Sequence, residues 1–491
     1  MHRLREPLLL FAIIVLAVAI RGVDLNGPCF YTDEVNELAL AKQSVTNVIF
    51  AADSMPPLYA LVHKAWLASW GTDAAARWLS VVFGVATVVC VWGIGRRLVD
   101  ASTGLAAAFL LAILPLHVLY SQFVRSYAMF AFFVALALWM LLRAVASDRA
   151  RDWCGFVLAS LAGAYTHYYF AIFLAVSLLV VVIMKRSLRV GKRALIAYVA
   201  IALGGLPLLY LLPGDFHFQT SLRDPQRLTA VSFAYTYLTF FTGDALGPSS
   251  RELHSISVGE AARGMAPWAA AIGIAALALG LEGWRALRSR PALPVLALLL
   301  VMPPLLVGGL GYAAGVNYHV RFVLWILIPL AVWLGAGLAA AGSRWHVELA
   351  TLGIACISII AIYNRHCVPR YQNEDLRGAA AYLHTHADQG QPVFVVSDYL
   401  STAARYYLEE PWQVVELPRP GGDNNVIAES SDLDVADATL SASAKPKQPF
   451  WLIYSREFHG DPKGLLLKHL SAMRHLSLAA EFAGVALYRS D

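Results

Sequence analysis

The sequence contains little charge for its length. Only 14% of its 491 residues are Asp, Glu, Lys or Arg, whereas 58% are hydrophobic. Charged residues make up roughly a quarter of an ordinary soluble domain, so this composition excludes that class. Hydrophobic runs close to the roughly 20 residues that cross a bilayer recur along most of the chain. The sequence therefore predicts a polytopic α-helical membrane protein.

Several familiar chemical signatures are also missing. The five cysteines form no CxxC pair and no metal-ligand spacing, although a disulfide between Cys29 and Cys367 outside the membrane stays open. There is no P-loop, no GxSxG, no HExxH and no GxGxxG in a convincing context, so nucleotide-driven chemistry on the inner side has no support. The net charge of +5 comes from basic residues scattered among short loops. That pattern fits orientation in a membrane and not binding to nucleic acid.

The hydrophobic runs predict about eleven spans, the first of them a retained anchor helix. They lie near 7–25, 76–97, 104–120, 126–144, 153–167, 169–185, 194–212, 266–284, 292–312, 322–341 and 346–363. The fifth and sixth are short and form a re-entering pair. Lys and Arg gather in alternate loops, which by the positive-inside rule places the N-terminus inside. We therefore expect a multi-pass protein of the cytoplasmic (inner) membrane, with its active site and C-terminal domain outside.

The chain is expected to divide into a transmembrane domain, 1–365, and a small extracytoplasmic α/β domain, 370–491. In the first outer loop, 26–75, an amphipathic piece is long enough for interfacial helices lying on the membrane. In the C-terminal domain the composition becomes soluble, and helices alternate with strands such as "PVFVVS", "QVVEL" and "FWLIYS". Residues 419–449 are rich in Pro, Gly, Asp, Ser and Ala and are predicted to form a flexible loop.

Four polar clusters fall on the predicted outer face. They are "YTDEVNE", "YSQFVRSYA", "AYTHYYF" and "VNYHVRF", beginning at residues 31, 120, 164 and 316. Ionisable residues at membrane depth are costly and usually functional, so four clusters on one side predict a site at the outer membrane boundary.

The acids Asp33 and Glu34 open the first cluster. As a catalytic pair, one carboxylate could take the proton of an acceptor hydroxyl. The pair could instead hold a divalent metal, which is the only cofactor left open. The alternative is structural: acids in the first turn of a helix complement its dipole, and Thr32 could cap it.

The other clusters supply cations and aromatic side chains. Arg125 could clamp a phosphate through two parallel hydrogen bonds, or it could extend toward lipid headgroups. His167 and the neighbouring tyrosines lie at a helix break, where an interfacial aromatic belt is the alternative. The candidate substrate-binding residues are Lys64, Gln122, Arg125, Tyr127, His167, Tyr168, His319 and Arg321. A carboxylate base beside phosphate-binding cations suits transfer onto a hydroxyl from a lipid-phosphate donor.

Six segments together resemble the GT-C membrane glycosyltransferases, the group of the protein mannosyltransferases and the lipid A aminoarabinose and galacturonic acid transferases. The segments are "YTDE" at 31–34, "MPPLYALVHKAW" at 55–66, "YSQFVRSYAM" at 120–129, "YTHYYFAIFL" at 165–174, "HVRFVLWILIPL" at 319–330 and "YQNEDLRGAAAYL" at 371–383. Their order and shared outer placement extend the resemblance over nearly the whole chain.

The resemblance implies an inverting transfer of sugar from a polyprenyl-phosphate carrier to an extracytoplasmic hydroxyl. It implies that Asp33 is the base, with Glu34 assisting. It also implies that Arg125, Lys64 and Arg321 bind the donor phosphate. Many relatives carry His or Lys just before "PPL", where this chain has Met55.

The partners expected are the lipid bilayer, the polyprenyl-phosphate sugar and an envelope glycan or glycolipid in preference to protein. A multi-span transporter is the alternative, although no internal repeat supports it.

Overall fold

The computed structural model describes residues 2–50, 55–184, 187–212, 228–340, 342, 344–421, 426–445 and 448–490. The described chain divides into two compact units. The first, called the helical unit here, comprises Met1–Leu25, Leu40–Leu246 and Ala266–Ile362. The second, the α/β unit, comprises Asn26–Ala39, Gly247–Met265 and Tyr363–Asp491. The transmembrane domain 1–365 and the extracytoplasmic domain 370–491 stay predictions.

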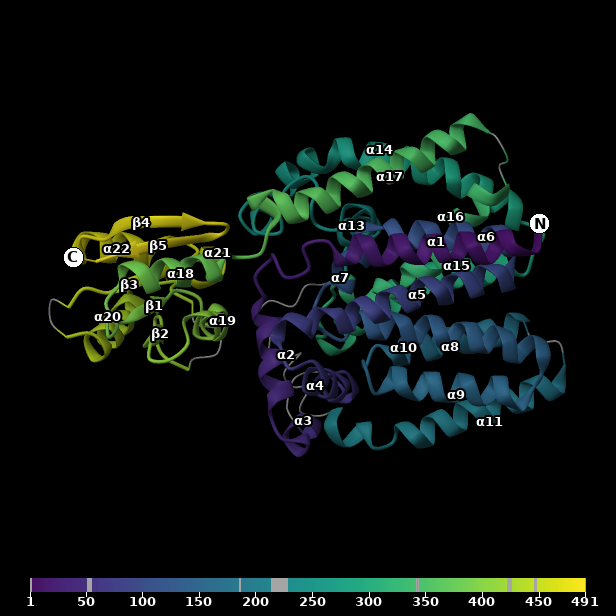
Figure 1. The fold of residues 1–491 in the computed structure, drawn as a ribbon, viewed down its shortest axis with the longest axis horizontal. Coiled ribbons are helices and arrows are strands. Elements are labelled where there is room, and N and C mark those ends of the chain that lie inside the picture. Colours follow the sequence, from purple (N-terminus) through teal and green to yellow (C-terminus); the bar gives the residue numbers. More distant parts are fainter. Residues whose placement is uncertain are drawn as a thin grey trace. The chain divides into compact units, whose positions relative to one another are not determined.

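The helical unit is built largely from long apolar helices packed side by side (Figure 1). Its helices, three of which continue into the α/β unit, are α1 (His2–Gly22), α2 (Thr32–Lys42), α3 (Val45–Phe50), α4 (Leu58–Trp70), α5 (Ala76–Leu98), α6 (Ala101–Ile113), α7 (Pro115–Ser121), α8 (Tyr127–Ser147), α9 (Ala150–Ala164), α10 (Phe170–Met184), α11 (Leu188–Gly205), α13 (Ala230–Thr242), α14 (Val258–Leu287), α15 (Ala292–Ala314), the 3₁₀ helix η3 (Val320–Ile326), α16 (Leu327–Ala340) and α17 (Trp345–Cys367).

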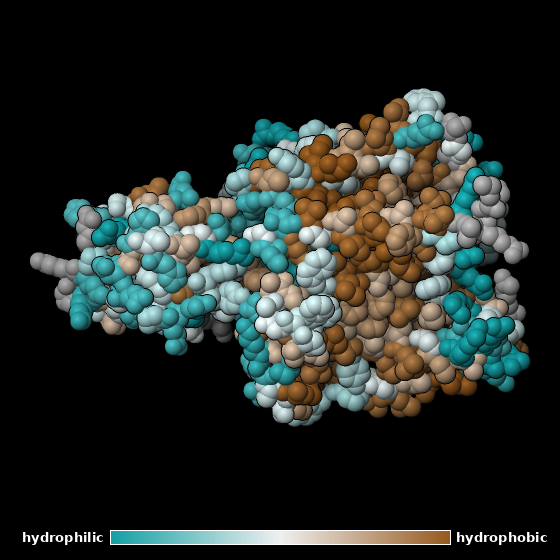
Figure 2. Space-filling model, in the orientation of Figure 1, coloured by the Kyte–Doolittle hydropathy of each residue, from teal (hydrophilic) through white to brown (hydrophobic). Residues whose placement is uncertain are grey.

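The length and apolar surface of these helices show a multi-pass membrane protein. In the described part of the chain, six helices are long and apolar enough to cross a bilayer, or seven if α6 and α7 count as one bent span. Figure 2 shows hydrophobic residues covering the flank of the helical unit. The predicted polytopic helical fold is therefore confirmed, while the total of about eleven spans and their orientation stay predictions.

A bend of 66° separates α6 from α7, where the sequence predicted one continuous span. Proline lacks an N–H, so Pro115 cannot bond the carbonyl of Leu111 four residues earlier. The fully buried guanidinium of Arg21 donates to these carbonyls instead. Its Nη1 lies 3.0 Å from the Ala112 carbonyl oxygen, and its Nη2 lies 3.5 Å from that of Leu111. The same Nη2 lies 2.7 Å from Nδ1 of His117. Arg21 thus satisfies carbonyls that the broken helix leaves open.

The α/β unit contains a five-stranded mixed sheet in the order β2-β1-β3-β5-β4. Its strands are β1 (Val393–Val395), β2 (Val414–Glu416), β3 (Trp451–Tyr454), β4 (Ser477–Phe482) and β5 (Val485–Arg489). β1 pairs in parallel with β2 and β3, and β5 is antiparallel to β3 and β4. The accompanying helices are α18 (Leu376–His386), α19 (Asp398–Leu408), α20 (Ser430–Ser443), α21 (Glu457–Gly460) and α22 (Leu465–Arg474).

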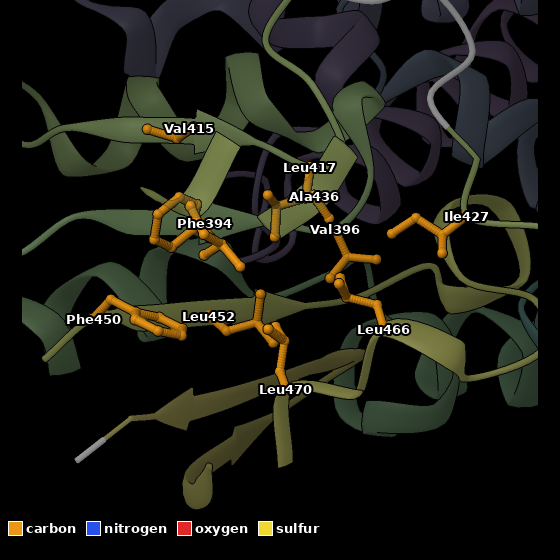
Figure 3. Packing of buried hydrophobic residues seen from close by; sticks show 11 residues of the cluster. Phe394, Val396, Val415, Leu417, Ile427, Ala436, Phe450, Leu452, Leu466 and Leu470 are labelled. Carbon is orange, nitrogen blue, oxygen red and sulfur yellow. The ribbon is translucent and has the colours of Figure 1, made fainter. Parts of the chain in front are cut away.

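Apolar side chains from strands and helices meet in the core of this unit. Phe394 of β1 and Leu452 of β3 lie among them and are fully buried, and Leu466 and Leu470 of α22 cover them (Figure 3). The sequence prediction of a small C-terminal α/β domain is confirmed for fold class.

The prediction of a flexible loop over 419–449 is wrong for its centre, which forms α20. A capping box begins this helix: the Glu429 side chain accepts from the N–H of Asp432, and the Asp432 side chain accepts from the N–H of Glu429. Ala436 and Leu440, four residues apart on one face, are buried in the core shown in Figure 3. The composition of 419–449 is typical of a loop and gave no sign of α20. The helix is stabilised by burial of the face that carries Ala436 and Leu440.

Two earlier segments of the chain pack within the α/β unit. The first is Asn26–Ala39, which contains Cys29. The Cys29 carbonyl accepts a hydrogen bond from the side-chain amide of Asn373 at 2.6 Å, and Cys29 Sγ donates to Asp375 at 3.1 Å. The second is Gly247–Met265, where Glu252 forms an ion pair with Arg370 at 2.7 Å. Cys29 and Cys367, both in the described part of the chain, are not joined by a disulfide in the structure.

We expect Glu416 at the end of β2 to make the stability of the α/β unit depend on pH in the acid range. Burial by itself would raise its pKa, but hydrogen bonds from Ser401, from the N–H of Gly421 and from Arg405 outweigh burial, so the pKa lies below its ordinary value of 4.5. This contribution to stability is present above about pH 4.5 and is lost as the pH falls through the lowered pKa.

We expect Glu416→Gln to flatten the loss of stability below pH 4.5. Hydrogen exchange of peptides from β1 and β2, measured between pH 3 and 7, is the readout. Glu481→Gln, at an exposed position of β4, is the matched control and should keep the wild-type pH profile. Equal pH profiles for wild type and Glu416→Gln would show that protonation of Glu416 does not cause the loss of stability in acid.

Candidate functional site

Three turns of the helical unit bring predicted site residues together. The turn between α7 and α8 carries Arg125, the turn between α9 and α10 carries His167, and His319 and Arg321 lie at the start of η3. Each turn follows from a helix break in the sequence, because polar and aromatic residues interrupt the apolar runs there. The three later polar clusters of the sequence therefore meet in space.

The ring of His167 lies at the centre of an aromatic cluster. It stacks on Phe130 with ring centroids 4.5 Å apart, and it lies 5.9 Å from the rings of both Tyr127 and Phe322. Tyr169 stacks on Phe322 at 4.6 Å. His167 is 1% exposed, so these rings shield the imidazole from solvent.

Two guanidinium groups accompany this aromatic cluster. The Arg321 guanidinium carbon lies 5.5 Å from the ring centroid of Tyr127 and 5.4 Å from that of Phe322, within the range of cation–π attraction. Arg125 is only 6% exposed although it lies in a turn. The charges of Arg321 and Arg125 both act on the His167 imidazole. The cluster therefore contains two guanidinium groups and is largely dry.

Backbone hydrogen bonds orient both histidines. The N–H of Tyr169 donates to Nδ1 of His167, and the N–H of Arg321 donates to Nδ1 of His319, each at 3.2 Å. With Nδ1 accepting, a neutral imidazole carries its proton on Nε2. Within the described ranges, Nε2 of His167 and the hydroxyl of Tyr127 are buried without a hydrogen-bond partner. Such buried donors require an explanation, and an oxygen-rich ligand is one.

The start of α4 links two of these turns. The N–H of Leu58 donates to the Tyr165 carbonyl at 2.9 Å, close to His167 in the chain. The hydroxyl of Tyr59 lies 3.3 Å from Ser80 Oγ, and Ser80 Oγ donates to the Phe123 carbonyl at 2.7 Å, two residues before Arg125. The "PPLY" segment thus fixes the positions of both turns, a role that local sequence patterns do not reveal.

Three other predicted residues of the helical unit have different surroundings. The Lys64 ammonium donates to the carbonyls of Ala41 and Gln43 at 3.2 and 2.6 Å. The Gln122 side chain donates to the Arg21 carbonyl at 3.0 Å. Tyr168 is half-buried in the turn that carries His167. Lys64 keeps one of its three N–H donors for another acceptor.

Asp33 and Glu34 belong to the α/β unit, whereas the other eight predicted residues belong to the helical unit. Glu34 is fully buried, and its Oε2 accepts the backbone N–H of Tyr31 at 3.0 Å. That bond is the glutamate half of a capping box, so the helix-start interpretation holds for Glu34. The proposed cap by Thr32 is wrong, because its hydroxyl is buried and makes no hydrogen bond within the described chain.

Asp33 has a partner from the C-terminal part of the chain. The hydroxyl of Tyr399 donates to Asp33 Oδ1 at 3.2 Å. The guanidinium carbon of Arg456 lies 4.9 Å from the Tyr399 ring centroid, and its Nε lies 2.8 Å from Oε1 of Glu374. Sequence reasoning missed Tyr399 and Arg456. The nearby "YQNEDLR" piece was the only available signal, because it contains Glu374.

In the described part of the chain, no three His, Cys, Asp or Glu side chains are grouped closely enough to hold a metal ion.

Comparisons with known proteins agree with this architecture. Residues 54–210, about a third of the chain, match the family of dolichyl-phosphate-mannose-protein mannosyltransferases. The solved structure of ArnT from Cupriavidus metallidurans bound to undecaprenyl phosphate is 13% identical, with a TM-score of 0.60 over 98% of this chain and 97% of that chain. A search of curated proteins finds no match.

A second similar structure is the Archaeoglobus fulgidus oligosaccharyltransferase in complex with Zn and sulfate. It is 14% identical, with a TM-score of 0.55 over 91% of this chain and 68% of that chain. The chain therefore has the fold of these two solved structures, which agrees with the resemblance predicted from sequence. The matching family segment and the fold both agree with the predicted class of enzyme, a glycosyltransferase.

Proposed function

We propose that the protein transfers a sugar, with inversion, from a polyprenyl-phosphate donor to a hydroxyl group of an extracytoplasmic glycan or glycolipid. The observation that carries the proposal is the pair of buried donors, His167 Nε2 and the Tyr127 hydroxyl, beside the guanidinium groups of Arg125 and Arg321. Undecaprenyl phosphate is bound in the solved ArnT structure of the same fold. A lipid-linked phosphate has the charge and oxygen atoms that this cluster can bind.

In this proposal the cluster binds the donor phosphate and stabilises it as it leaves. The bond between the anomeric carbon and the phosphate oxygen breaks, and negative charge grows on the departing lipid phosphate. Arg125 and Arg321 oppose that charge in a dry site, where electrostatic stabilisation is strongest. His167 and Tyr127 donate to the phosphate oxygens. These donors also replace the cation that is absent at Met55.

Asp33 is the proposed general base. Its carboxylate accepts the proton of the acceptor hydroxyl as that oxygen attacks the anomeric carbon from the face opposite the phosphate. The products are the glycosylated acceptor and the free lipid phosphate. Glu34 supports this step by beginning α2, which holds Asp33 in place. Lys64 remains a candidate for the donor phosphate through its third N–H.

Mass spectrometry of envelope glycolipids and glycoproteins, from cells with and without the gene, tests the proposal. We expect one lipid-linked glycan to lose a single sugar residue in the absence of the gene, and that difference identifies both sugar and acceptor. Purified protein should then transfer this sugar from its polyprenyl phosphate. Loss of the sugar from a protein only would contradict the acceptor class, and no loss from any envelope component would contradict the transfer itself.

Tyr399 is a positioning residue for Asp33 in this scheme. We expect Tyr399→Phe to lower kcat about fivefold to tenfold with little change in the donor KM, because the orienting hydrogen bond to Asp33, worth roughly 1–1.5 kcal/mol, is removed. The phenylalanine ring still packs against Arg456.

Tyr382→Phe is the matched control, since it removes a hydroxyl that donates to the Ala479 carbonyl in the same α/β unit. Its kcat should equal that of wild type. A Tyr399→Phe enzyme that changes only in thermal stability, with kcat unaltered, would reduce Tyr399 to a structural residue.

A further inference from the structure

A second feature of the helical unit lies at the opposite end of α8 from Tyr127. α8 has 21 residues and is therefore about 30 Å long at 1.5 Å per residue. At its Ser147 end, a hollow of about 410 Å³ is lined by the C-terminal end of α5, the end of α8 and the start of α9. This volume is within the range of small-molecule sites. The hollow is thus separate from the aromatic cluster.

Five arginines and one aspartate line this hollow. The arginines are Arg96, Arg97, Arg143, Arg149 and Arg151. The aspartate, Asp152, is buried and already engaged, because Ser147 Oγ donates to it at 2.6 Å and Arg143 pairs with it at 3.1 Å.

The arginines differ in how far nearby acids neutralise them. Arg96 is paired with Glu6 at 3.4 Å. Arg151 lies 4.0 Å from Asp152, at the limit of an ion pair. Across the residues that the structure describes, no acidic side chain forms an ion pair with Arg97 or Arg149, and both are exposed. The hollow therefore has excess positive charge that solvent or a ligand can reach.

Two indole rings form rigid walls beside these charges. Trp139 packs directly against Gly93, leaving no room for a Cβ atom there. The Arg96 guanidinium carbon lies 5.3 Å from the ring centroid of Trp92, which holds that arginine over the indole. Indole rings of this kind are enriched at the level of lipid headgroups.

We propose that this hollow binds the headgroup phosphate of an anionic glycerophospholipid. Arginine side chains bind phosphate oxygens through a planar fork of N–H donors, and basic pockets between membrane helices at the headgroup level take anionic lipids. Positive charge that merely orients a membrane protein needs only to lie in loops. Here arginines from three helix ends instead surround one hollow with a single, already paired acid. This site is independent of the proposed sugar transfer.

Native mass spectrometry of the full chain in neutral detergent tests the site. The chain is titrated with dioleoylphosphatidylglycerol, with zwitterionic dioleoylphosphatidylcholine, and with phosphatidylglycerol in the presence of inorganic phosphate. The test variant is Arg97→Gln with Arg149→Gln. The matched control, Lys192→Gln with Arg288→Gln, removes the same charge from exposed positions that do not line the hollow. Lys192 adjoins Arg193, which pairs with Asp148, and Arg288 is two residues from Arg290, which donates to the Val99 carbonyl.

We expect wild type and the control to bind phosphatidylglycerol in preference to phosphatidylcholine, and the test variant to bind it about tenfold more weakly. Equal weakening in the control would overturn the site, because general surface charge would then explain binding. Displacement of the lipid by millimolar inorganic phosphate would overturn the lipid assignment in favour of a free phosphate ligand. Thermal unfolding should be unchanged in both variants, since all four side chains project from the surface or lie in loops.

Discussion

Asp33→Asn should reduce sugar transfer by about 10²–10⁴-fold while leaving the protein in the membrane and folded. General-base catalysis contributes about this factor, and an asparagine cannot accept the proton of the acceptor hydroxyl. The asparagine carbonyl can still accept the hydrogen bond from Tyr399, which in the native protein joins Asp33 Oδ1 at 3.2 Å. The loss should therefore appear in kcat and not in donor binding. The measurement is single-sugar transfer by purified protein from the donor that the envelope comparison identifies.

Glu34→Gln separates the two neighbouring acids. Glutamine keeps a side-chain oxygen that can accept the N–H of Tyr31, so α2 should begin as before. We expect this variant to retain most of the wild-type kcat. Asp388→Asn, at a surface position of the α/β unit, is the control for general effects of losing an acid. A fully active Asp33→Asn enzyme would exclude Asp33 as the base. If the Glu34→Gln enzyme were also inactive, Glu34 would be the base instead.

Arg21→Met should lower the stability of the helical unit by about 2–5 kcal/mol. Methionine fills much of the volume but donates no hydrogen bond, so the Leu111 and Ala112 carbonyls and His117 lose their partner in a buried site. Each buried polar group left unsatisfied costs about 1–3 kcal/mol. Equilibrium unfolding in mixed detergent micelles, followed by tryptophan fluorescence, measures the change.

Pro115→Ala provides the double-mutant cycle for this prediction. Alanine restores the N–H that can donate to the Leu111 carbonyl. That carbonyl then no longer depends on the Arg21 guanidinium for a hydrogen bond. Arg21→Met should then cost less in the Pro115→Ala background than in wild type. Equal costs in both backgrounds would show that Arg21 does not stabilise the helix break. Arg21→Lys, which keeps the charge but not the fork of donors, should recover only part of the stability.

Local sequence patterns predicted a large part of this protein. Apolar runs of bilayer length need only their own composition to identify a membrane helix, and strands such as Val393–Val395 are recognisable from a short buried apolar run. The interruptions of those runs located the turns that carry Arg125, His167 and Arg321. The sequence also predicted that these turns share one side of the membrane, which is consistent with their meeting in one aromatic cluster.

The sequence by itself therefore determined the class of the protein, its alternation of helices and turns, and which residues were worth suspecting. Only the tertiary structure decided their partners. Tyr399 contacts Asp33 across 366 residues, and Arg21 contacts the carbonyl of Ala112 across 91. Contacts of this kind are selected by the packing of whole elements, so neither residue carries a local pattern that indicates its partner. α20 was missed for the same reason, because its stability comes from the core against which Ala436 and Leu440 pack.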